Sequence, residues 1–260
     1  MSKKATEFQR KEMSRMYRGK EIFKPLNTGW IDQNVACVRE WVANIFFYRK
    51  GDATIMIDAG YNYDRLAEKM GWLGIDPKSI RHILITHQDT DHVGAVEADS
   101  PGLFRDATLY IGETENKYKY LTGETRRKVI YHLYKLPQVT INNEKVLLRD
   151  GQIMDIDGIK IECFLVPGHT WGHMVYLIDD KYLFTGDTIW FGADGGYEGR
   201  FTQCGICTLL KKLGLYDLTP AMCHLDYTMS EAGGVTNFVR QYTLASGGPY
   251  CDCGYKKKTV

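Results

Sequence analysis

Short apolar runs recur along this chain, and each run gives way to a polar or glycine-rich loop. Residues 42–57 contain two such runs around a turn signal, and this pattern predicts a β-hairpin. Residues 63–73 instead carry apolar side chains at helical spacing, which predicts an amphipathic helix. Residues 80–85 form the next apolar run and predict the strand that follows this helix.

The remaining pattern continues this order of strands and helices. Residues 113–135 are polar and rich in tyrosine, and we expect a helical excursion there. Residues 207–213 predict a further amphipathic helix. Apolar runs predict the other strands, at residues 107–111, 146–148, 153–156, 159–166, 174–178, 182–184 and 221–224. This order suits two packed sheets with helices outside, and it places polar loops on one edge of the sheets.

The two ends of the chain differ from its middle. Residues 1–21 are largely polar and charged and predict an N-terminal helical arm, and residues 22–228 predict one catalytic domain. Residues 229–260 predict a C-terminal extension, the last sixteen residues of which resemble a tail. The arm and the extension are each compatible with a homodimer contact.

Composition narrows the class of protein. The 260 residues are 44% hydrophobic and 25% charged, as in a soluble globular protein. The formal net charge is +1, so the sequence predicts no broad basic surface for nucleic acid. No apolar stretch reaches the ~20 residues that cross a membrane, and the charged N-terminus has no signal-peptide core. We therefore expect a cytoplasmic protein with a small-molecule substrate.

The chain has seven cysteines, and this odd number argues against a disulfide framework. Cys204 and Cys207 form a C-x-x-C pair, which is compatible with a redox-active dithiol or half of a metal site. No second C-x-x-C completes a four-thiolate site. We therefore favour two reduced thiols that face a core or a subunit interface.

The candidate chemistry begins directly after the apolar run 83–85, where the chain reads Thr-His-Gln-Asp-Thr-Asp-His. His87, Asp89 and Asp91 alternate in this segment, so an extended loop would point all three the same way. His92 breaks the alternation and would face a neighbouring ion. Imidazole nitrogens and carboxylate oxygens are common ligands of metal ions in proteins.

Three more residues of ligand type follow separate apolar runs. They are His169, Asp187 and His224, and the common edge of two sheets would bring them together. The joint pattern favours a dinuclear metal site over solvated loops. Asp187 has two carboxylate oxygens and can bridge two ions.

These motifs resemble those of the metallo-β-lactamase superfamily. The resemblance rests on Thr-His-x-x-x-Asp-His, then Gly-His-Thr, Thr-Gly-Asp-Thr and a final His, and it extends over roughly residues 22–228. Residues 57–60 and 73–77 also match. The resemblance implies an α/β fold, a four-layer αββα sandwich with metals at one rim. It also implies a layout similar to glyoxalase II and the lactonase-like hydrolases.

The resemblance further implies how the ligands are divided between the ions. Asp58 would orient a ligand through a hydrogen bond, and His173 reads as a packed imidazole rather than a ligand. The implied ligands are His87, Asp89 and His169 for one ion, Asp91, His92 and His224 for the other, and Asp187 as the bridge.

One position departs from the family pattern, because the usual motif has histidine where this chain has Asp89. The extra carboxylate lowers the formal charge of a dinuclear centre, which should acidify its bound water less. Oxygen ligands also suit iron and manganese better than thiophilic ions. We therefore expect two divalent metal ions as cofactors, either zinc or, given Asp89, iron or manganese.

The motifs predict a metal-dependent hydrolase in which a metal-bridging hydroxide cleaves an ester-type bond. Asp91 would accept and return a proton. Candidate substrates are a thioester, a lactone, another ester or a phosphodiester, with a β-lactam less favoured. Two alternatives stay open: a diiron redox protein resembling the metal module of flavodiiron oxygen and nitric oxide reductases, and a non-catalytic ligand-binding module.

Substrate contacts are expected from residues near the metal motifs. Tyr197 or Tyr227 would donate a hydrogen bond to an oxyanion, and Arg200 would hold an acidic substrate. Four tyrosines of the polar excursion are compatible with either an aromatic wall or helix packing: Tyr118, Tyr120, Tyr131 and Tyr134.

Overall fold

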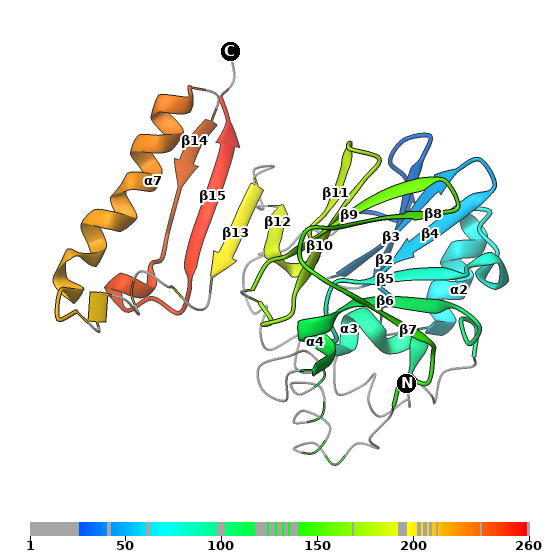
Figure 1. Cartoon of the computed structure of the whole chain (residues 1–260). Coiled ribbons are helices and arrows are strands. Elements are labelled where there is room, and N and C mark those ends of the chain that lie inside the picture. Colours follow the sequence, from blue (N-terminus) through cyan, green and yellow to red (C-terminus); the bar gives the residue numbers. More distant parts are fainter. Residues whose placement is uncertain are drawn as a thin grey trace. The chain divides into compact units, whose positions relative to one another are not determined.

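The computed structural model divides the chain into two compact units, and Gly186 and Asp187 mark their junction. The N-terminal unit holds two packed sheets, and the C-terminal unit holds a third sheet and a long helix (Figure 1). The structure describes residues 26–40, 43–60, 63–97, 102–117, 140–167, 169–191, 197–201, 213–234 and 236–258, together with positions 124, 128, 132, 135, 204, 207, 210 and 211.

The larger sheet of the N-terminal unit has seven strands in sequence order. Its strands are β1 (Gly29–Trp30), β2 (Val35–Glu40), β3 (Ala43–Lys50), β4 (Ala53–Ile57), β5 (His82–Ile85), β6 (Thr108–Gly112) and β7 (Lys145–Leu148). The strands from β1 to β4 pair antiparallel, whereas β4, β5, β6 and β7 pair parallel. The carboxyl ends of four strands therefore meet at one edge, where loops can share a site.

The second sheet packs face to face against the first. Its strands are β8 (Gln152–Ile156), β9 (Ile159–Leu165), β10 (Met174–Ile178) and β11 (Tyr182–Phe184), antiparallel in the order β11-β10-β9-β8. Leu84 of the first sheet and Tyr176 of the second are both fully buried in the core between them. The Tyr176 hydroxyl donates to the Ile85 carbonyl oxygen at 2.6 Å, which fixes the end of β5 against the second sheet.

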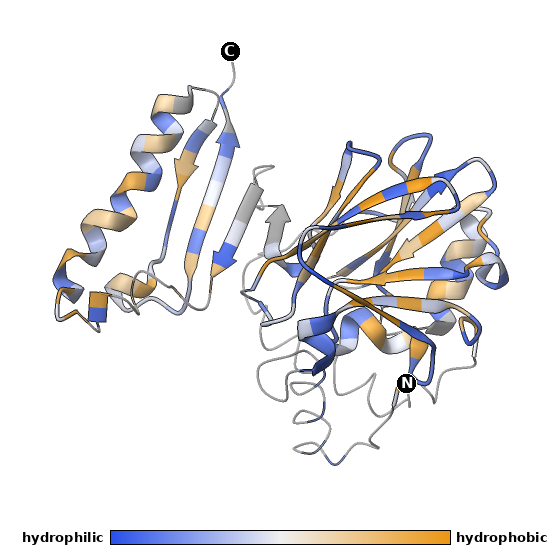
Figure 2. Ribbon diagram, in the orientation of Figure 1, coloured by the Kyte–Doolittle hydropathy of each residue, from blue (hydrophilic) through white to orange (hydrophobic). Residues whose placement is uncertain are grey.

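Helices cover the other face of the larger sheet. The helix α2 (Tyr63–Trp72) places Leu66 and Met70 in a core cluster with Ile83 and Ile85. Successive β5 side chains therefore enter opposite cores, because strand side chains alternate. Figure 2 shows hydrophobic residues concentrated on the strands and polar residues at their ends. The shorter helices are η1 (Pro77–Ser79) between α2 and β5, α3 (Thr90–Val93) and η2 (Gly94–Val96) between β5 and β6, and α4 (Glu113–Lys117) after β6.

Within the described residues, the C-terminal unit has a four-stranded antiparallel sheet and one long α-helix. The strands lie in the order β12-β13-β15-β14. Helix α7 (Thr219–Gly233) packs against β14, and Ser230 Oγ donates to the Thr236 carbonyl oxygen at 3.1 Å. The other elements are η3 (Gly186–Thr188), β12 (Ile189–Phe191), β13 (Tyr197–Phe201), η4 (Tyr216–Leu218), β14 (Thr236–Val239), η5 (Leu244–Ser246) and β15 (Cys251–Lys257).

The strands predicted between residues 42 and 184 and the helix at 63–73 are confirmed. The strand predicted at residues 221–224 is wrong, because these residues lie inside α7. Pro220 stands in the first turn of that helix and Gly234, with φ of +74°, ends it, as helix signals require. The predicted tail is also wrong, because β15 pairs with both β13 and β14.

The structural division at Gly186 and Asp187 differs from the predicted domains, which end at residues 21 and 228. The predicted arm, residues 1–21, lies outside the described residues. Of the excursion at 113–135, the structure describes α4 and four single positions. Among the described helices, none is long and apolar enough to cross a membrane.

Candidate metal centre

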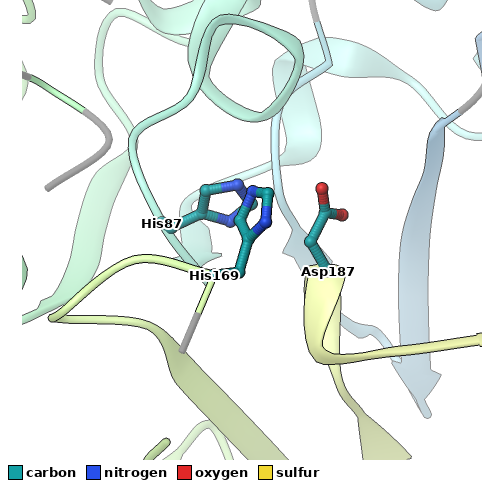
Figure 3. Close-up of side chains that lie close together, drawn as sticks. All are labelled: His87, His169 and Asp187. Atoms are coloured by element: carbon teal, nitrogen blue, oxygen red, sulfur yellow. The ribbon is translucent and has the colours of Figure 1, made fainter. Parts of the chain in front are cut away.

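All the predicted ligands except His224 gather where strands of the N-terminal unit end. Asp58 follows β4, and the segment from His87 to His92 follows β5. His169 lies between β9 and β10, and Asp187 follows Gly186, with which the N-terminal unit ends. Figure 3 shows the side chains of His87, His169 and Asp187 close together.

The first ligand group contains His87, His169 and Asp187. One ligand atom from each lies within 4.8 Å of the others. Asp89 joins them, because its Oδ2 atom is 3.5 Å from His87 Nε2 and 3.1 Å from His169 Nε2. These separations suit atoms that share one ion at about 2.0–2.2 Å. The structure therefore places Asp89 beside His87 and His169, and its role as a ligand stays a prediction.

The second ligand group contains Asp91, His92 and Asp187, again with ligand atoms within 4.8 Å of one another. His92 Nε2 lies 3.7 Å from Asp91 Oδ2. Asp187 is therefore common to both groups, and its role as a bridge between two ions stays a prediction. The two imidazole rings of His87 and His92 have centroids 4.0 Å apart, so the groups are immediate neighbours.

A separate observation supports a metal ion at this donor set. The His87 side chain is 0% exposed, and its Nε2 atom has no hydrogen-bond partner among the described residues. A buried polar atom without a partner costs about 1–3 kcal/mol. A divalent cation at this point would satisfy the nitrogen, whereas an apolar side chain would not.

A single buried carboxylate sets the tautomers of two ligands. Asp58 Oδ2 accepts a hydrogen bond from His92 Nδ1 at 2.8 Å, and Oδ1 accepts one from the Thr86 backbone N–H at 2.8 Å. The Thr86 hydroxyl donates to Asp58 Oδ2 at 2.8 Å, so its oxygen accepts from His87 Nδ1 at 3.0 Å. Both imidazoles then carry their proton on Nδ1, and Nε2 keeps the lone pair that a metal needs.

The approach of Asp187 to these groups depends on a glycine. Gly186 has φ of +50°, and a Cβ atom there would lie 2.7 Å from Thr86 Oγ1 and 2.8 Å from the His173 ring. Only glycine fits this close approach. His173 itself is buried, stacks on His87 at 4.9 Å and belongs to neither ligand group, in agreement with its interpretation as a packed imidazole.

Sequence reasoning missed Glu115. Its side chain is buried and accepts hydrogen bonds from the Gln88 backbone N–H and from the Thr170 hydroxyl, both at 2.9 Å. The residue lies in the polar segment that was interpreted only as a helical excursion. The available signal was its place just beyond β6, at the edge where neighbouring strands carry the ligands.

The C-terminal unit holds the other predicted site residues. His224 lies on α7, where its ring stacks on Tyr227 at 5.4 Å, and it belongs to neither ligand group. The predicted strand that would have delivered His224 is wrong, so its role as a ligand stays a prediction without that support. The Arg200 guanidinium lies 4.8 Å from the centre of the Tyr250 ring.

Other predicted site residues lie where less of the structure is described. The Tyr197 side chain lies outside the description, as do Tyr118, Tyr120, Tyr131 and Tyr134. All seven cysteines are free thiols. The Cys207 backbone N–H donates to Cys204 Sγ at 3.4 Å, and burial is the main cause that raises the pKa of Cys207 to about 11.

Two packed sheets whose strand ends carry paired imidazoles and carboxylates define a class of metal-dependent α/β proteins. This chain belongs to the metallo-β-lactamase superfamily, because residues 38–203 match the model of that family. The predicted family and fold class are confirmed. Residues 184–255 also match the model described as L-2-amino-thiazoline-4-carboxylic acid hydrolase, a stretch that lies almost wholly in the C-terminal unit.

Several curated proteins are similar to this chain. A probable polyketide biosynthesis zinc-dependent hydrolase, BaeB of Bacillus velezensis, is 29% identical over 61% of this chain and 55% of its own length. A hydroxyacylglutathione hydrolase of Salmonella gallinarum is 33% identical over 57% and 49%. An atrochrysone carboxyl ACP thioesterase of Aspergillus fumigatus is 27% identical over 56% and 39%. The chain thus spans about half the length of the curated relatives it matches.

Solved structures also resemble this chain at low identity. The Rm3 metallo-beta-lactamase is 18% identical, with a TM-score of 0.47, over 62% of this chain and 60% of that one. A B3 metallo-beta-lactamase described as having an active site glutamic acid is 20% identical, with a TM-score of 0.47, over 65% and 64%.

Proposed function

We propose that this protein is a hydrolase that uses two divalent metal ions to cleave an ester-type bond. The observation that supports this most is the pair of ligand groups joined at Asp187, because two-metal hydrolases hold adjacent ions between shared ligands. The proposed ligands are His87, Asp89 and His169 for one ion, Asp91 and His92 for the other, and Asp187 for both.

Bound ions of this kind acidify a water molecule and polarise the carbonyl oxygen of a substrate. The chain's own residues have separate tasks. Asp58 and Thr86 keep the Nδ1 protons of two imidazoles in place. The Asp91 side chain is 31% exposed against 14% for Asp89. Asp91 is therefore the carboxylate better placed to take a proton from water and return it to a leaving group.

The donor set supports a proposal about the identity of the ions. Three carboxylates, Asp89, Asp91 and Asp187, accompany the imidazoles and offset most of the charge of two divalent cations. A less positive centre binds iron or manganese competitively with zinc, because hard oxygen donors suit those ions. Zinc is the ion in the name of the Bacillus velezensis relative. We propose that Asp89 broadens this preference toward iron and manganese.

We propose a thioester as the substrate class. The support comes from relatives named as an ACP thioesterase and as hydroxyacylglutathione hydrolases. An acyl–sulfur bond has a good leaving group, so it tolerates a centre whose water is less acidified by an additional carboxylate. A lactone must expel an alkoxide, which is a poorer leaving group than a thiolate, and a phosphodiester reacts at a tetrahedral phosphorus. Both serve as comparison substrates.

The test is a panel of hydrolytic assays on wild type and Asp187→Ala, each with its metal content measured. The panel contains an acyl-thioester, a lactone, bis(p-nitrophenyl) phosphate and a β-lactam. We expect thioester turnover in wild type and its loss by more than about 100-fold in Asp187→Ala, because the shared ligand is gone. Asp180→Ala, an exposed aspartate that pairs with Lys160 and belongs to neither ligand group, is the control. Wild-type turnover in Asp187→Ala would refute the proposal.

The C-terminal unit supports a second proposal. We infer that it is a module with its own ligand, because it forms a compact unit and residues 184–255 match a different family model. The compound named for that family, L-2-amino-thiazoline-4-carboxylic acid, is the first to add to the panel. Turnover of this compound that survives Asp187→Ala would separate the two modules.

A further inference from the structure

The buried carboxylate of Glu115 lies between two loops that carry the candidate metal ligands. Glu115 belongs to α4, which begins directly after β6. Its residue exposure is 0%, and both of its oxygens are engaged by the protein. A charged side chain is rarely buried to this degree unless its hydrogen bonds are satisfied, so the position has a specific requirement for it.

One carboxylate oxygen holds the loop that follows β5. Glu115 Oε1 accepts a hydrogen bond from the Gln88 backbone N–H at 2.9 Å. The Gln88 side chain returns toward the same residue, with Nε2 3.5 Å from the Glu115 carbonyl oxygen. Gln88 lies between His87 and Asp89 in the chain. Fixing its backbone therefore fixes the direction of the ligands on either side.

The other oxygen holds the loop between β9 and β10. Glu115 Oε2 accepts a hydrogen bond from the Thr170 hydroxyl at 2.9 Å, and Thr170 directly follows His169. The backbone of the same loop packs on Glu115, because a Cβ atom on Gly172 would lie 2.1 Å from the Glu115 nitrogen. The loop is thus seated on the start of α4 by both a hydrogen bond and close backbone contact.

The candidate ligands that lie next to Gln88 and Thr170 in the chain all belong to the ligand group of one ion. His87, Asp89 and His169 are the residues adjacent to Gln88 and Thr170, and they form the first ligand group together with Asp187. The second group is secured differently, because His92 is oriented by Asp58 and Asp91 lies in the first turn of α3. A change at Glu115 should therefore reach one ion much more than the other.

We propose that Glu115 is a positioning residue for the ion held by His87, Asp89 and His169, and that it sets the affinity of that site alone. The proposal rests on the proposed two-metal function. A carboxylate suits this role because its two oxygens accept from two loops at once, and bonds to an ionised acceptor are stronger than neutral ones. Partners of this kind typically change metal affinity by about 10- to 100-fold when they are removed.

The test measures the two stepwise binding constants for Zn²⁺ by competition with a chromophoric chelator, using metal-free full-length protein. The variants are Glu115→Ala, Glu115→Gln and, as the control, Glu113→Ala. Glu113 lies on the same short helix but forms ion pairs with Lys117 and Arg149 at the surface. The absorption spectrum of the Co²⁺-loaded protein reports the ligand geometry of each site, and circular dichroism reports the fold.

We expect Glu115→Ala to weaken one binding constant by about 10- to 100-fold, to leave the other at its wild-type value and to alter one of two Co²⁺ signatures. Glu115→Gln should restore most of the affinity, because its amide oxygen accepts from Gln88 and its amide nitrogen donates to Thr170. Glu113→Ala should bind as wild type does. Thr170→Val removes one of the two bonds and should weaken the same site less.

Equal loss at both sites in Glu115→Ala, or no loss at either, would overturn the proposal. If Glu115→Ala does not fold, Thr170→Val provides the test, and wild-type Zn²⁺ binding constants in that variant would overturn the proposal. Failure of wild type to bind two ions would overturn both this proposal and the proposed function. Two ions bound equally well by wild type and Glu115→Ala would overturn this proposal alone.

Discussion

The Asp58→Asn substitution tests the hydrogen-bond network beneath the metal centre with little change in shape. Asp58 has φ of +60°, and asparagine tolerates this left-handed backbone, so the change isolates the side chain. The carboxylate accepts from three donors, namely the Thr86 backbone N–H, the Thr86 hydroxyl and His92 Nδ1. An amide has one acceptor oxygen, so at least one buried donor must lose its partner whichever way the amide is turned.

The expected magnitude follows from that lost bond. A buried donor left without its acceptor costs about 1–3 kcal/mol, and more where the acceptor was charged. If the amide nitrogen faces His92, the imidazole proton moves to Nε2, and the lone pair no longer points at the ligand group. Both outcomes weaken metal binding by about 10- to 100-fold, which corresponds to about 1.4–2.7 kcal/mol.

The assay pairs metal affinity with urea unfolding of the metal-free protein. We expect weaker binding and a loss of stability of about 1–3 kcal/mol in Asp58→Asn. The control is Asp180→Asn, an exposed aspartate that also has positive φ, of +54°, and should match wild type in both measurements. Wild-type metal affinity in Asp58→Asn would refute the assigned role of Asp58.

Three further predictions rest on single features of the structure. Gly186→Ala should weaken metal binding and destabilise the protein by about 1–3 kcal/mol, because its Cβ would meet Thr86 Oγ1 at 2.7 Å at a positive φ; urea unfolding and chelator competition measure both effects. Burial raises the pKa of Cys37 to about 11 and that of Cys163 to about 12. Iodoacetamide should therefore modify both thiols slowly at pH 7.5 and faster as the pH rises toward those values, as measured by peptide mass spectrometry. Rapid labelling at pH 7.5 would contradict their burial. Protein purified in air from iron-rich medium should absorb visible light, because Asp89 is expected to admit iron and a ferric centre is coloured. A colourless protein with two zinc ions would contradict the broadened metal preference.

The N-terminal unit was predictable because two independent signals coincide there. Apolar runs such as residues 80–85 mark buried strands, and ligand-type residues follow those runs at the same edge. Parallel pairing of β4 with β5 then brings Asp58 and His87 together, although 29 positions separate them in the sequence. Joint occurrence of motifs carried more information than any one histidine.

The C-terminal unit shows where the same reasoning fails. Residues 221–224 form an apolar run too short to separate strand from helix by periodicity, and Pro220 and Gly234 were the better signals. Strand β15 contains glycine, cysteine and lysine and lacks an alternating apolar pattern, so the sequence does not indicate a strand there. It is a strand because β13 and β14 pair with it on both sides. Glu115 was missed because its place just beyond β6 indicates nearness to the site, whereas the sequence does not tell a buried carboxylate from a solvated one.

Anomalous diffraction from crystals of the full chain, grown without chelator, tests the central claim most directly. We expect two anomalous peaks, each within about 2.0–2.2 Å of its ligand atoms, one at Nε2 of His87 and one at Nε2 of His92, with Asp187 contacting both. Data collected at the zinc, iron and manganese edges would also identify the ions. A single peak, or two peaks away from these imidazoles, would contradict the account.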